Sequence, residues 1–279
     1  MKKVLWSFLI MVLALGLFSA GGRAAVTGDA TDSQGTKVQE KTAGQTKTND
    51  NNNSDNNKTT EKKETNLKKQ KTVFVAAGHQ RRGISAHERY APKGSGTKAK
   101  LTSGTAGVRT HIPEYKTNLA IAKALQKELE KRGYKVIMLR TTNNCPLSNQ
   151  QRTKKANKSG ADIHICIHCD SAGSGSSGPH TCVPASSKYV GKKIYNKSCK
   201  LANLVLSSTA KAVGKKSRGA IRSNYYTTIN WAKIPTFILD CGYLSNPRED
   251  KQLNSKSYQK KLAKGIANGV DKYFNIKGN

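Results

Sequence analysis

Acidic residues are scarce in this chain of 279 residues, which holds 17 Asp and Glu against 49 Lys and Arg and has a formal net charge of +32. So one-sided a balance implies an anionic partner. Aromatic residues are also few, at 6%, and no basic segment with interleaved aromatic residues resembles a nucleic-acid-binding motif. The sequence therefore predicts a polyanion other than nucleic acid as a binding partner.

A long hydrophobic run is missing too. The most apolar segment, residues 4–18, is shorter than the about 20 residues that span a membrane. It follows two lysines and precedes small residues at 19–25, an order typical of a secretory signal peptide. We therefore expect residues 1–25 to direct export, either as a cleaved signal peptide or, since Arg23 disturbs the cleavage site, as an N-terminal membrane anchor. The chain is then expected at the cell wall or outside the cell, with anionic cell-wall polymers as partners.

Apolar residues are again scarce between residues 26 and 70, where Thr, Asn, Lys, Gln, Ser and Asp dominate. Such a composition buries too little surface to offset the entropy of ordering, so we expect a disordered linker. Residues 71–279 suffice for one domain, which we expect to be a monomer. Cys166-x-x-Cys169 has no second pair to complete a zinc knuckle, and Cys166 and Cys241 lie in apolar runs, as small buried side chains do.

The pattern of apolar residues predicts alternating strands and helices. Strands are expected at residues 72–77, 134–139, 162–167, 178–183 and 235–239, and helices at 113–132, 148–158, 201–213 and 258–274. This alternation favours an α/β fold with a mostly parallel mixed sheet of about six strands and helices on both faces. Residues 80–111 show no such pattern and predict a long functional loop.

Polar side chains follow three of the predicted strands. His79 comes after the first, His168 after residues 162–167 and Asp240 after residues 235–239, while Glu114 lies in the first turn of the helix opened by Pro113. The carboxyl ends of parallel strands meet at one edge of a sheet, so we expect these groups to converge. Two imidazoles and one carboxylate form a catalytic zinc set with a position left for water. The sequence therefore predicts a zinc hydrolase in which Asp240 accepts the water proton.

Each of these residues has a plainer explanation when taken alone. A single His after a strand is often a hydrogen-bonded structural residue. Glu114 suits the positive end of a helix dipole, and Asp240 could bind the backbone amides of the following turn. Only their joint placement favours the metal site.

The remaining polar candidates are expected to be structural. His164 lies in the middle of a predicted strand, where a buried and hydrogen-bonded imidazole is expected. Three further histidines are expected to be exposed in polar loops: His87, His111 and His180, of which His111 is close enough to Glu114 in the sequence to remain an alternative ligand. Arg152, on the helix at 148–158, is expected to pair with Asp162 or to contact the substrate.

A series of motifs runs in order along the chain: Ala77-Gly-His79-Gln, Gly104-Thr-Ala-Gly107, Glu114-Tyr-x-x-Asn118, Ser148-Asn-x-x-Arg152 and Gly242-Tyr-Leu-Ser-Asn246-Pro. This series resembles the zinc-dependent N-acetylmuramoyl-L-alanine amidases of bacterial peptidoglycan. The resemblance implies Zn²⁺ bound by His79, Glu114 and His168, with peptidoglycan as the substrate. The reaction implied is hydrolysis of the amide between the lactyl group of muramic acid and L-alanine of the stem peptide. Three motif residues are further candidates to contact the substrate or support the metal ligands: Asn118, Arg152 and Asn246.

Two positions depart from the pattern of that family. It usually carries Asp-x-Gly-His, where this chain has Ala76-Ala77-Gly-His79, so His79 is expected to lack a supporting carboxylate. The family's catalytic glutamate is here Asp240, whose side chain is shorter by one methylene, about 1.5 Å. The alternative is therefore a catalytically weakened protein that binds peptidoglycan or regulates its turnover while keeping the amidase fold.

Overall fold

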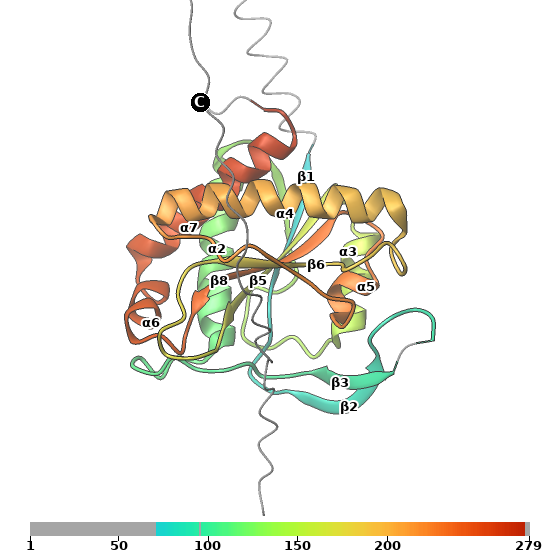
Figure 1. Ribbon diagram of the computed structural model, residues 1–279, viewed down its shortest axis with the longest axis horizontal. Helices are drawn as coiled ribbons and strands as arrows, with labels where there is room; N and C mark the ends of the chain where they lie inside the picture. Colours follow the sequence, from blue (N-terminus) through green and yellow to red (C-terminus); the bar gives the residue numbers. More distant parts are fainter. Residues whose placement is uncertain (1–70, 95, 277–279) are drawn as a thin grey trace, which may run out of the picture. The chain divides into compact units, whose positions relative to one another are not determined.

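The computed structural model describes residues 71–94 and 96–276 (Figure 1). The expected export segment, residues 1–25, and the expected linker, residues 26–70, lie outside the described residues. Among the residues that are described, none of the helices combines the length and the apolar character needed to cross a membrane.

A mixed six-stranded sheet forms the centre of the fold, in the order β4-β1-β5-β8-β6-β7. The strands are β1 (Thr72–Ala77), β4 (Lys135–Met138), β5 (Ile163–Asp170), β6 (His180–Val183), β7 (Ala220–Arg222) and β8 (Thr236–Tyr243). The pairs β4–β1, β1–β5 and β5–β8 are parallel, and β6 runs antiparallel to β8. Strands β1, β5 and β8 are almost entirely buried on both faces. Their sequences are therefore mostly apolar and do not alternate regularly between apolar and polar residues.

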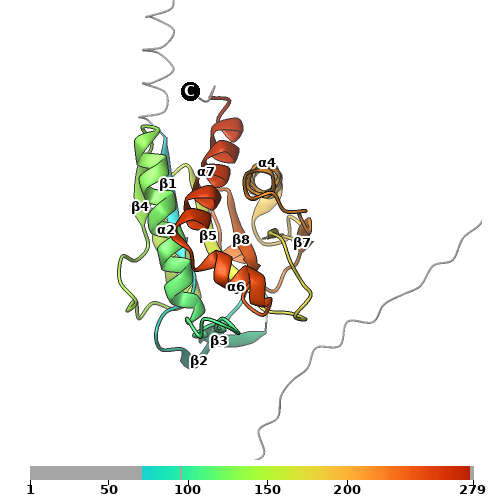
Figure 2. The ribbon, with the colours of Figure 1, turned by 90° about the vertical axis from the view of Figure 1, so that its left-hand side faces the viewer.

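Helices cover both faces of the sheet, which confirms the predicted fold class. One face carries α2 (Glu114–Lys131), α4 (Gly191–Val213) and α7 (Lys256–Tyr273), and Figure 2 shows α7 between the other two, with α4 seen end-on. The opposite face carries α3 (Asn149–Lys158) and the short α5 (Thr227–Asn230). The remaining helix, α6 (Pro247–Leu253), follows β8 directly.

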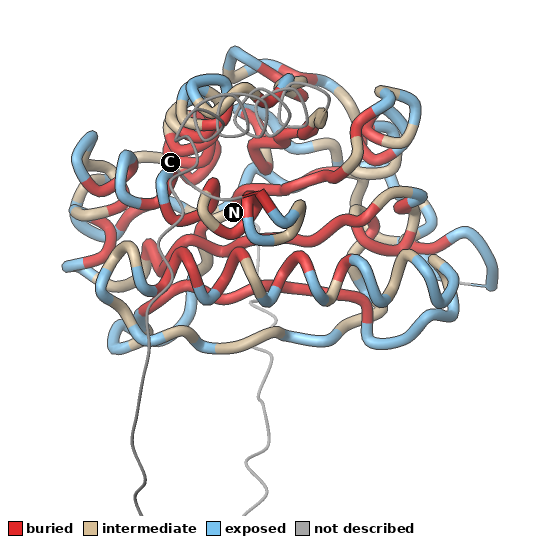
Figure 3. Tube along the Cα trace, turned by 90° about the horizontal axis from the view of Figure 1, so that it is seen from above, coloured by how far each residue is buried: buried red, intermediate tan, exposed pale blue. Residues whose placement is uncertain are grey.

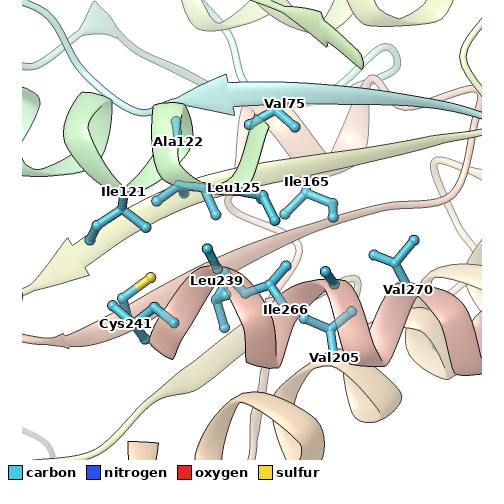
Figure 4. Close-up of a cluster of buried hydrophobic side chains, with 14 of the residues drawn as sticks. Val75, Ile121, Ala122, Leu125, Ile165, Val205, Leu239, Cys241, Ile266 and Val270 are labelled. Carbon is cyan, nitrogen blue, oxygen red and sulfur yellow. The ribbon is translucent and has the colours of Figure 1, made fainter. Parts of the chain in front are cut away.

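The main core lies between the sheet and the first of these helical layers. Figure 4 shows Val75, Ile165 and Leu239 from three neighbouring strands facing Leu125 of α2 and Ile266 of α7. Burying an aliphatic side chain of this size stabilises the fold by about 1.5–3 kcal/mol. Figure 3 shows the consequence along the chain: the central strands are buried along almost all of their length, whereas the helices are buried on one side only. The carboxyl ends of the strands are thereby held in fixed positions.

Three details differ from the sequence-based expectation. Residues 80–111 are not without secondary structure, because they contain an antiparallel ribbon of β2 (Ile84–Arg89) and β3 (Thr97–Leu101), low in Figure 1. Most of its side chains are partly or fully exposed, so no apolar period marked it in the sequence. Helix α4 also begins ten residues earlier than expected, at Gly191, because its first two turns carry mainly polar and basic residues. The short elements β7, α5 and α6 were not predicted at all.

Candidate functional site

A cavity of about 380 Å³ opens at the carboxyl ends of the central strands. His79 follows β1, His168 lies near the end of β5, and Asp240 lies opposite His168 on β8. His168 and Asp240 are inside their strands and not after them, because β5 and β8 run on to Asp170 and Tyr243. Glu114, in the first turn of α2, lines the same cavity, so all four polar groups singled out in the sequence meet there.

His79, Glu114 and His168, the primary donor set, have the geometry of metal ligands. Glu114 Oε2 lies 3.2 Å from His79 Nε2, and Glu114 Oε1 lies 3.1 Å from His168 Nδ1. One ligand atom from each of the three residues lies within 4.8 Å of the others. Ligands about 2.0–2.1 Å from a tetrahedral ion are about 3.3 Å apart, so this arrangement fits zinc closely.

His79 does not lack a supporting partner, despite the alanines that precede it. Its Nδ1 lies 2.8 Å from the carbonyl oxygen of Thr102, at the end of the β2–β3 ribbon. Because a carbonyl oxygen can only accept, Nδ1 carries a hydrogen, and in the neutral ring that a metal requires Nε2 would then hold the lone pair. The guanidinium of Arg152 also donates to the backbone carbonyl of His79, at 3.1 Å. The ribbon thus supplies the support that the usual motif takes from a carboxylate.

The carboxylate of Glu114 is almost completely buried and is held by several donors. It accepts hydrogen bonds from the backbone amides of Thr105 and Cys169, both at 3.2 Å, and from the side-chain amide of Asn118 at 3.0 Å. Burial alone would raise the pKa of Glu114, but hydrogen bonds from His168 and His79 hold it well below its usual range. Burial lowers the pKa of His168, which favours the neutral imidazole that a metal requires.

Two glycines leave room for these ligands. A Cβ at Gly78 would collide with the imidazole of His168, and one at Gly104 would collide with Glu114 Oε2 and the ring of His79. Gly104 also has a φ of +83°, which favours glycine. These contacts explain why both glycines belong to the motifs identified in the sequence.

The three supporting candidates from the motifs occupy different places. Asn118, fully buried, bonds Glu114 and the Gly78 carbonyl. Arg152 donates to three backbone carbonyls, those of Leu147, Cys145 and His79. Its expected partner Asp162 instead accepts from Lys71 and from the amide of Thr72. Asn246 caps α6 by accepting from the amides of Arg248 and Glu249.

His180 is the residue that sequence reasoning misplaced. It was expected to be exposed in a loop but is only 1% exposed, at the start of β6. Its Nε2 lies 3.3 Å from Asp240 Oδ2, and Cys182 Sγ lies 3.8 Å from the same oxygen. Residues two apart on a strand share a face. The strand predicted at residues 178–183 therefore implies that His180 and Cys182 lie on the same face, a signal that could have identified the pair. The burial itself depends on the neighbouring strands β7 and β8, which no local pattern reveals.

The other histidines follow the expectations more closely. His87 and His111 are exposed, and His164 is buried in mid-strand. His164 differs in one respect, since neither ring nitrogen has a hydrogen-bond partner among the described residues. Burial lowers the pKa of His164 to about 3, so the ring is neutral and packs edge-on against Phe74 as an apolar group.

The environment of Asp240 is opposite to that of Glu114. Burial, followed by the negative charges of Asp170 and Glu114, raises the pKa of Asp240 well above its usual range. One pocket thus holds a carboxylate that stays ionised and a second one that readily takes a proton. Such a separation suits an anionic role, such as metal binding, for one group and an acid–base role for the other.

Residues 73–272 match the family model described as N-acetylmuramoyl-L-alanine amidase. The chain belongs to this family. The expected resemblance and enzyme class are therefore confirmed.

Individual relatives and solved structures are similar over most of the chain. The uncharacterized protein YqiI of Bacillus subtilis is 28% identical over 204 residues, which cover 73% of this chain and 85% of that protein. The N-acetylmuramoyl-L-alanine amidase of Clostridium difficile 630 superposes with a TM-score of 0.59 at 28% identity, covering 75% of this chain and 98% of that one. The amidase Ami1 of Mycobacterium smegmatis shares the fold, with a TM-score of 0.68 at 20% identity and coverage of 75% and 98%.

Proposed function

We propose that this chain is an exported zinc enzyme that hydrolyses the amide between N-acetylmuramic acid and L-alanine of the stem peptide in peptidoglycan. The observation that carries the proposal is the primary donor set, in which three residues far apart in the sequence place a ligand atom within 4.8 Å of one another. Two imidazoles and one carboxylate favour zinc over Mg²⁺ or Ca²⁺, which prefer oxygen ligands. The high positive charge suits a partner among the anionic polymers of the cell wall.

His79, Glu114 and His168 would hold the metal, and Asp240 would move the proton. Bound zinc supplies a polarised scissile carbonyl and a water whose pKa is lowered to about 7. The raised pKa of Asp240 makes its carboxylate a stronger proton acceptor than an ordinary aspartate. Once protonated, the same carboxyl group can donate to the leaving nitrogen of L-alanine. General acid–base catalysis of this kind contributes about 10²–10⁴-fold to the rate.

The wall of the pocket offers groups for a substrate that carries both sugar and peptide. The β2–β3 ribbon contributes Lys98 and Thr102, and β7 contributes Ile221. The ammonium group of Lys98 lies 4.4 Å from the centre of the Tyr225 ring, and Tyr225 is itself 55% exposed. An exposed aromatic ring with an adjacent cation is suited to the apolar face of a sugar and to a neighbouring carboxylate. We therefore assign the ribbon to substrate binding.

Asp240 motivates the one competing proposal, a weakened enzyme that binds the wall. Its Oδ2 lies near His180 and Cys182, so the shorter side chain is partly engaged away from the primary donor set. A displacement of a catalytic group by about 1 Å can cost about 100-fold in rate. If the rate of hydrolysis falls by more than this factor, binding to peptidoglycan would be the main activity.

The test is a digest of purified sacculi with the full chain, first stripped by a chelator and then reloaded with zinc. We expect new amino termini at L-alanine in the reloaded sample and none in the stripped one. New termini elsewhere in the stem peptide would mean a peptidase. No new termini, with the protein still sedimenting with sacculi, would mean a binding protein, and either result overturns the proposal.

A further inference from the structure

A second donor cluster, made of His180, Cys182 and Asp240, lines the same cavity as the primary donor set. All three residues are buried, at 1%, 2% and 8% exposure. His180 Nε2 and Cys182 Sγ lie 3.3 and 3.8 Å from Asp240 Oδ2, and one donor atom from each residue falls within 4.8 Å of the others. The family assignment and the proposed proton transfer give no role to the imidazole or the thiol.

The strands fix this geometry. His180 and Cys182 point to the same face of β6 because they are two residues apart, and His180 is paired directly with Asp240 of β8. Tyr243, also on β8, places its hydroxyl 3.2 Å from His180 Nδ1. That hydroxyl oxygen can accept a hydrogen bond from Nδ1, which leaves the Nε2 lone pair free to bind a cation.

Charge in this region also favours a cation. Asp170 Oδ2 lies 3.5 Å from His180 Nε2 and provides a further oxygen on the open side of the cluster. The opposing charge is Arg218, whose guanidinium carbon lies 5.3 Å from the centre of the Tyr243 ring. The carboxylates of Asp170 and Asp240 outnumber the Arg218 guanidinium, so a divalent ion bound between them would offset their negative charge.

We infer that His180, Cys182 and Asp240 form a second zinc site, with Asp170 or water as the fourth ligand. One nitrogen, one sulfur and one oxygen donor make a set that zinc accepts and that Mg²⁺ and Ca²⁺ do not. Binding would displace the protons of Cys182 and of Asp240, so affinity should increase with pH. The primary donor set has no sulfur, which makes the two sites spectroscopically distinguishable.

Occupation of this site would inhibit hydrolysis, a consequence that rests on the proposed function. A cation bound to Asp240 withdraws the carboxylate from proton transfer. Zinc would therefore activate the enzyme through the primary donor set and inhibit it through the second donor cluster. Activity should rise and then fall as zinc is added.

The binding test is a Co²⁺ titration of the metal-free full chain. We expect two equivalents to bind, one of which gives the ultraviolet charge-transfer absorption of a cobalt–thiolate bond. Cys182→Ser should lose that absorption and bind one equivalent. The matched control Cys199→Ser, at a half-buried cysteine on α4, should keep both. Glu114→Gln should keep the thiolate absorption while losing the other equivalent.

Several outcomes overturn the second site. Binding of a single equivalent by the wild-type chain would contradict it, and so would the absence of thiolate absorption; neither result depends on how any variant folds. Persistence of the absorption in Cys182→Ser would assign it to another cysteine.

The activity test compares, within each protein, hydrolysis of sacculi at saturating zinc with the maximum reached during the titration. We expect a fall of about 10²-fold or more in the wild-type chain, as for removal of a general base, and no fall in Cys182→Ser. If two equivalents bind but excess zinc leaves activity at its maximum, the inhibitory role is wrong. If no hydrolysis is seen at any zinc level, the proposed function fails while the cobalt titration still decides the second site.

Discussion

The two sides of the pocket each carry a buried carboxylate, and their surroundings treat these groups in opposite ways. In the primary donor set, two imidazoles and two backbone amides hold Glu114 as an anion. In the second donor cluster, burial and the charges of Asp170 and Glu114 favour the protonated form of Asp240. Burial alone raises both pKa values. The partners that the strands and helix α2 supply therefore keep Glu114 ionised and favour protonation of Asp240, as their proposed roles of metal ligand and proton acceptor require.

The largest effect is expected at Glu114. Glu114→Gln removes the charge that neutralises the metal, so zinc content should fall and hydrolysis should drop by about 10³-fold or more, since metal catalysis contributes several kcal/mol. Zinc analysis and a sacculus digest measure both. Glu130→Gln, on the exposed side of the same helix, is the matched control and should change neither. Full activity in Glu114→Gln would remove this residue from the metal site.

Asp240 tests the other side of the comparison. Asp240→Asn should slow hydrolysis by about 10²–10⁴-fold, because the amide accepts no proton, while zinc stays bound to the primary donor set. Asp240→Glu restores the missing methylene and should keep or raise the activity. Rates and zinc content measured side by side separate the two roles. An Asn variant as active as the parent would show that Asp240 is not the proton acceptor.

A smaller effect is expected from the residues that support the ligands. Asn118→Ala removes a donor to Glu114 and should weaken zinc binding by about 10–100-fold. Arg152→Lys should act in the same direction, because lysine cannot reproduce a guanidinium fork that reaches three carbonyls. Competition with a fluorescent chelator measures the affinity. Unchanged affinity in both variants would restrict these residues to stabilising the fold.

Asp250 is a third buried carboxylate to compare with Glu114 and Asp240, because its pKa is lowered although no imidazole of the described residues contacts it. Asp250, on α6, accepts bonds from the amides of Arg109 and Thr110 and from the Thr110 hydroxyl. Burial would raise the pKa of Asp250, but these bonds lower it. Asp250→Asn should therefore destabilise the fold by about 1–3 kcal/mol at neutral pH with little effect on zinc binding.

The effect of Asp250→Asn on stability should depend on pH, because folding lowers the pKa of Asp250. A carboxyl group whose pKa is lower in the folded state stabilises the fold above its unfolded pKa of about 3.9, and loses this contribution as the pH falls through the folded value. The stability difference between the wild-type chain and Asp250→Asn should be full at pH 6 and shrink below about pH 4. Urea unfolding at several pH values measures it. A difference independent of pH would mean that ionisation of Asp250 contributes nothing.

The sequence predicted the side of the pocket whose residues are fixed by strong local patterns. His79 and His168 follow or end long apolar strands, and Glu114 begins a helix with clear periodicity, so chain order alone placed them at one edge of the sheet. On the other side of the pocket the sequence predicted a strand at residues 178–183 and placed Asp240 at the site, but it did not predict that His180 is buried beside Asp240. The burial of His180 comes from the pairing of β6 with β7 and β8, and a local sequence pattern does not reveal such contacts across the sheet.

The supporting contacts were missed for the same reason. The partner of His79 is a backbone carbonyl of Thr102, 23 residues away on an exposed ribbon that lacked any apolar period. A backbone acceptor leaves no residue-type signal, so the sequence suggested a missing partner where the structure supplies one. Arg152 was expected to be structural or substrate-binding, and its bonds to three carbonyls could not be read from its spacing on α3.

The most direct test of the central claim is the position of zinc in crystals of the full chain grown with one equivalent of the metal. Anomalous diffraction at the zinc edge should show a peak about 2.0–2.2 Å from His79 Nε2, from His168 Nδ1 and from an oxygen of Glu114, with Asp240 near it but not bound to it. An active crystalline enzyme whose zinc lies elsewhere, with no peak among these three residues, would contradict the account.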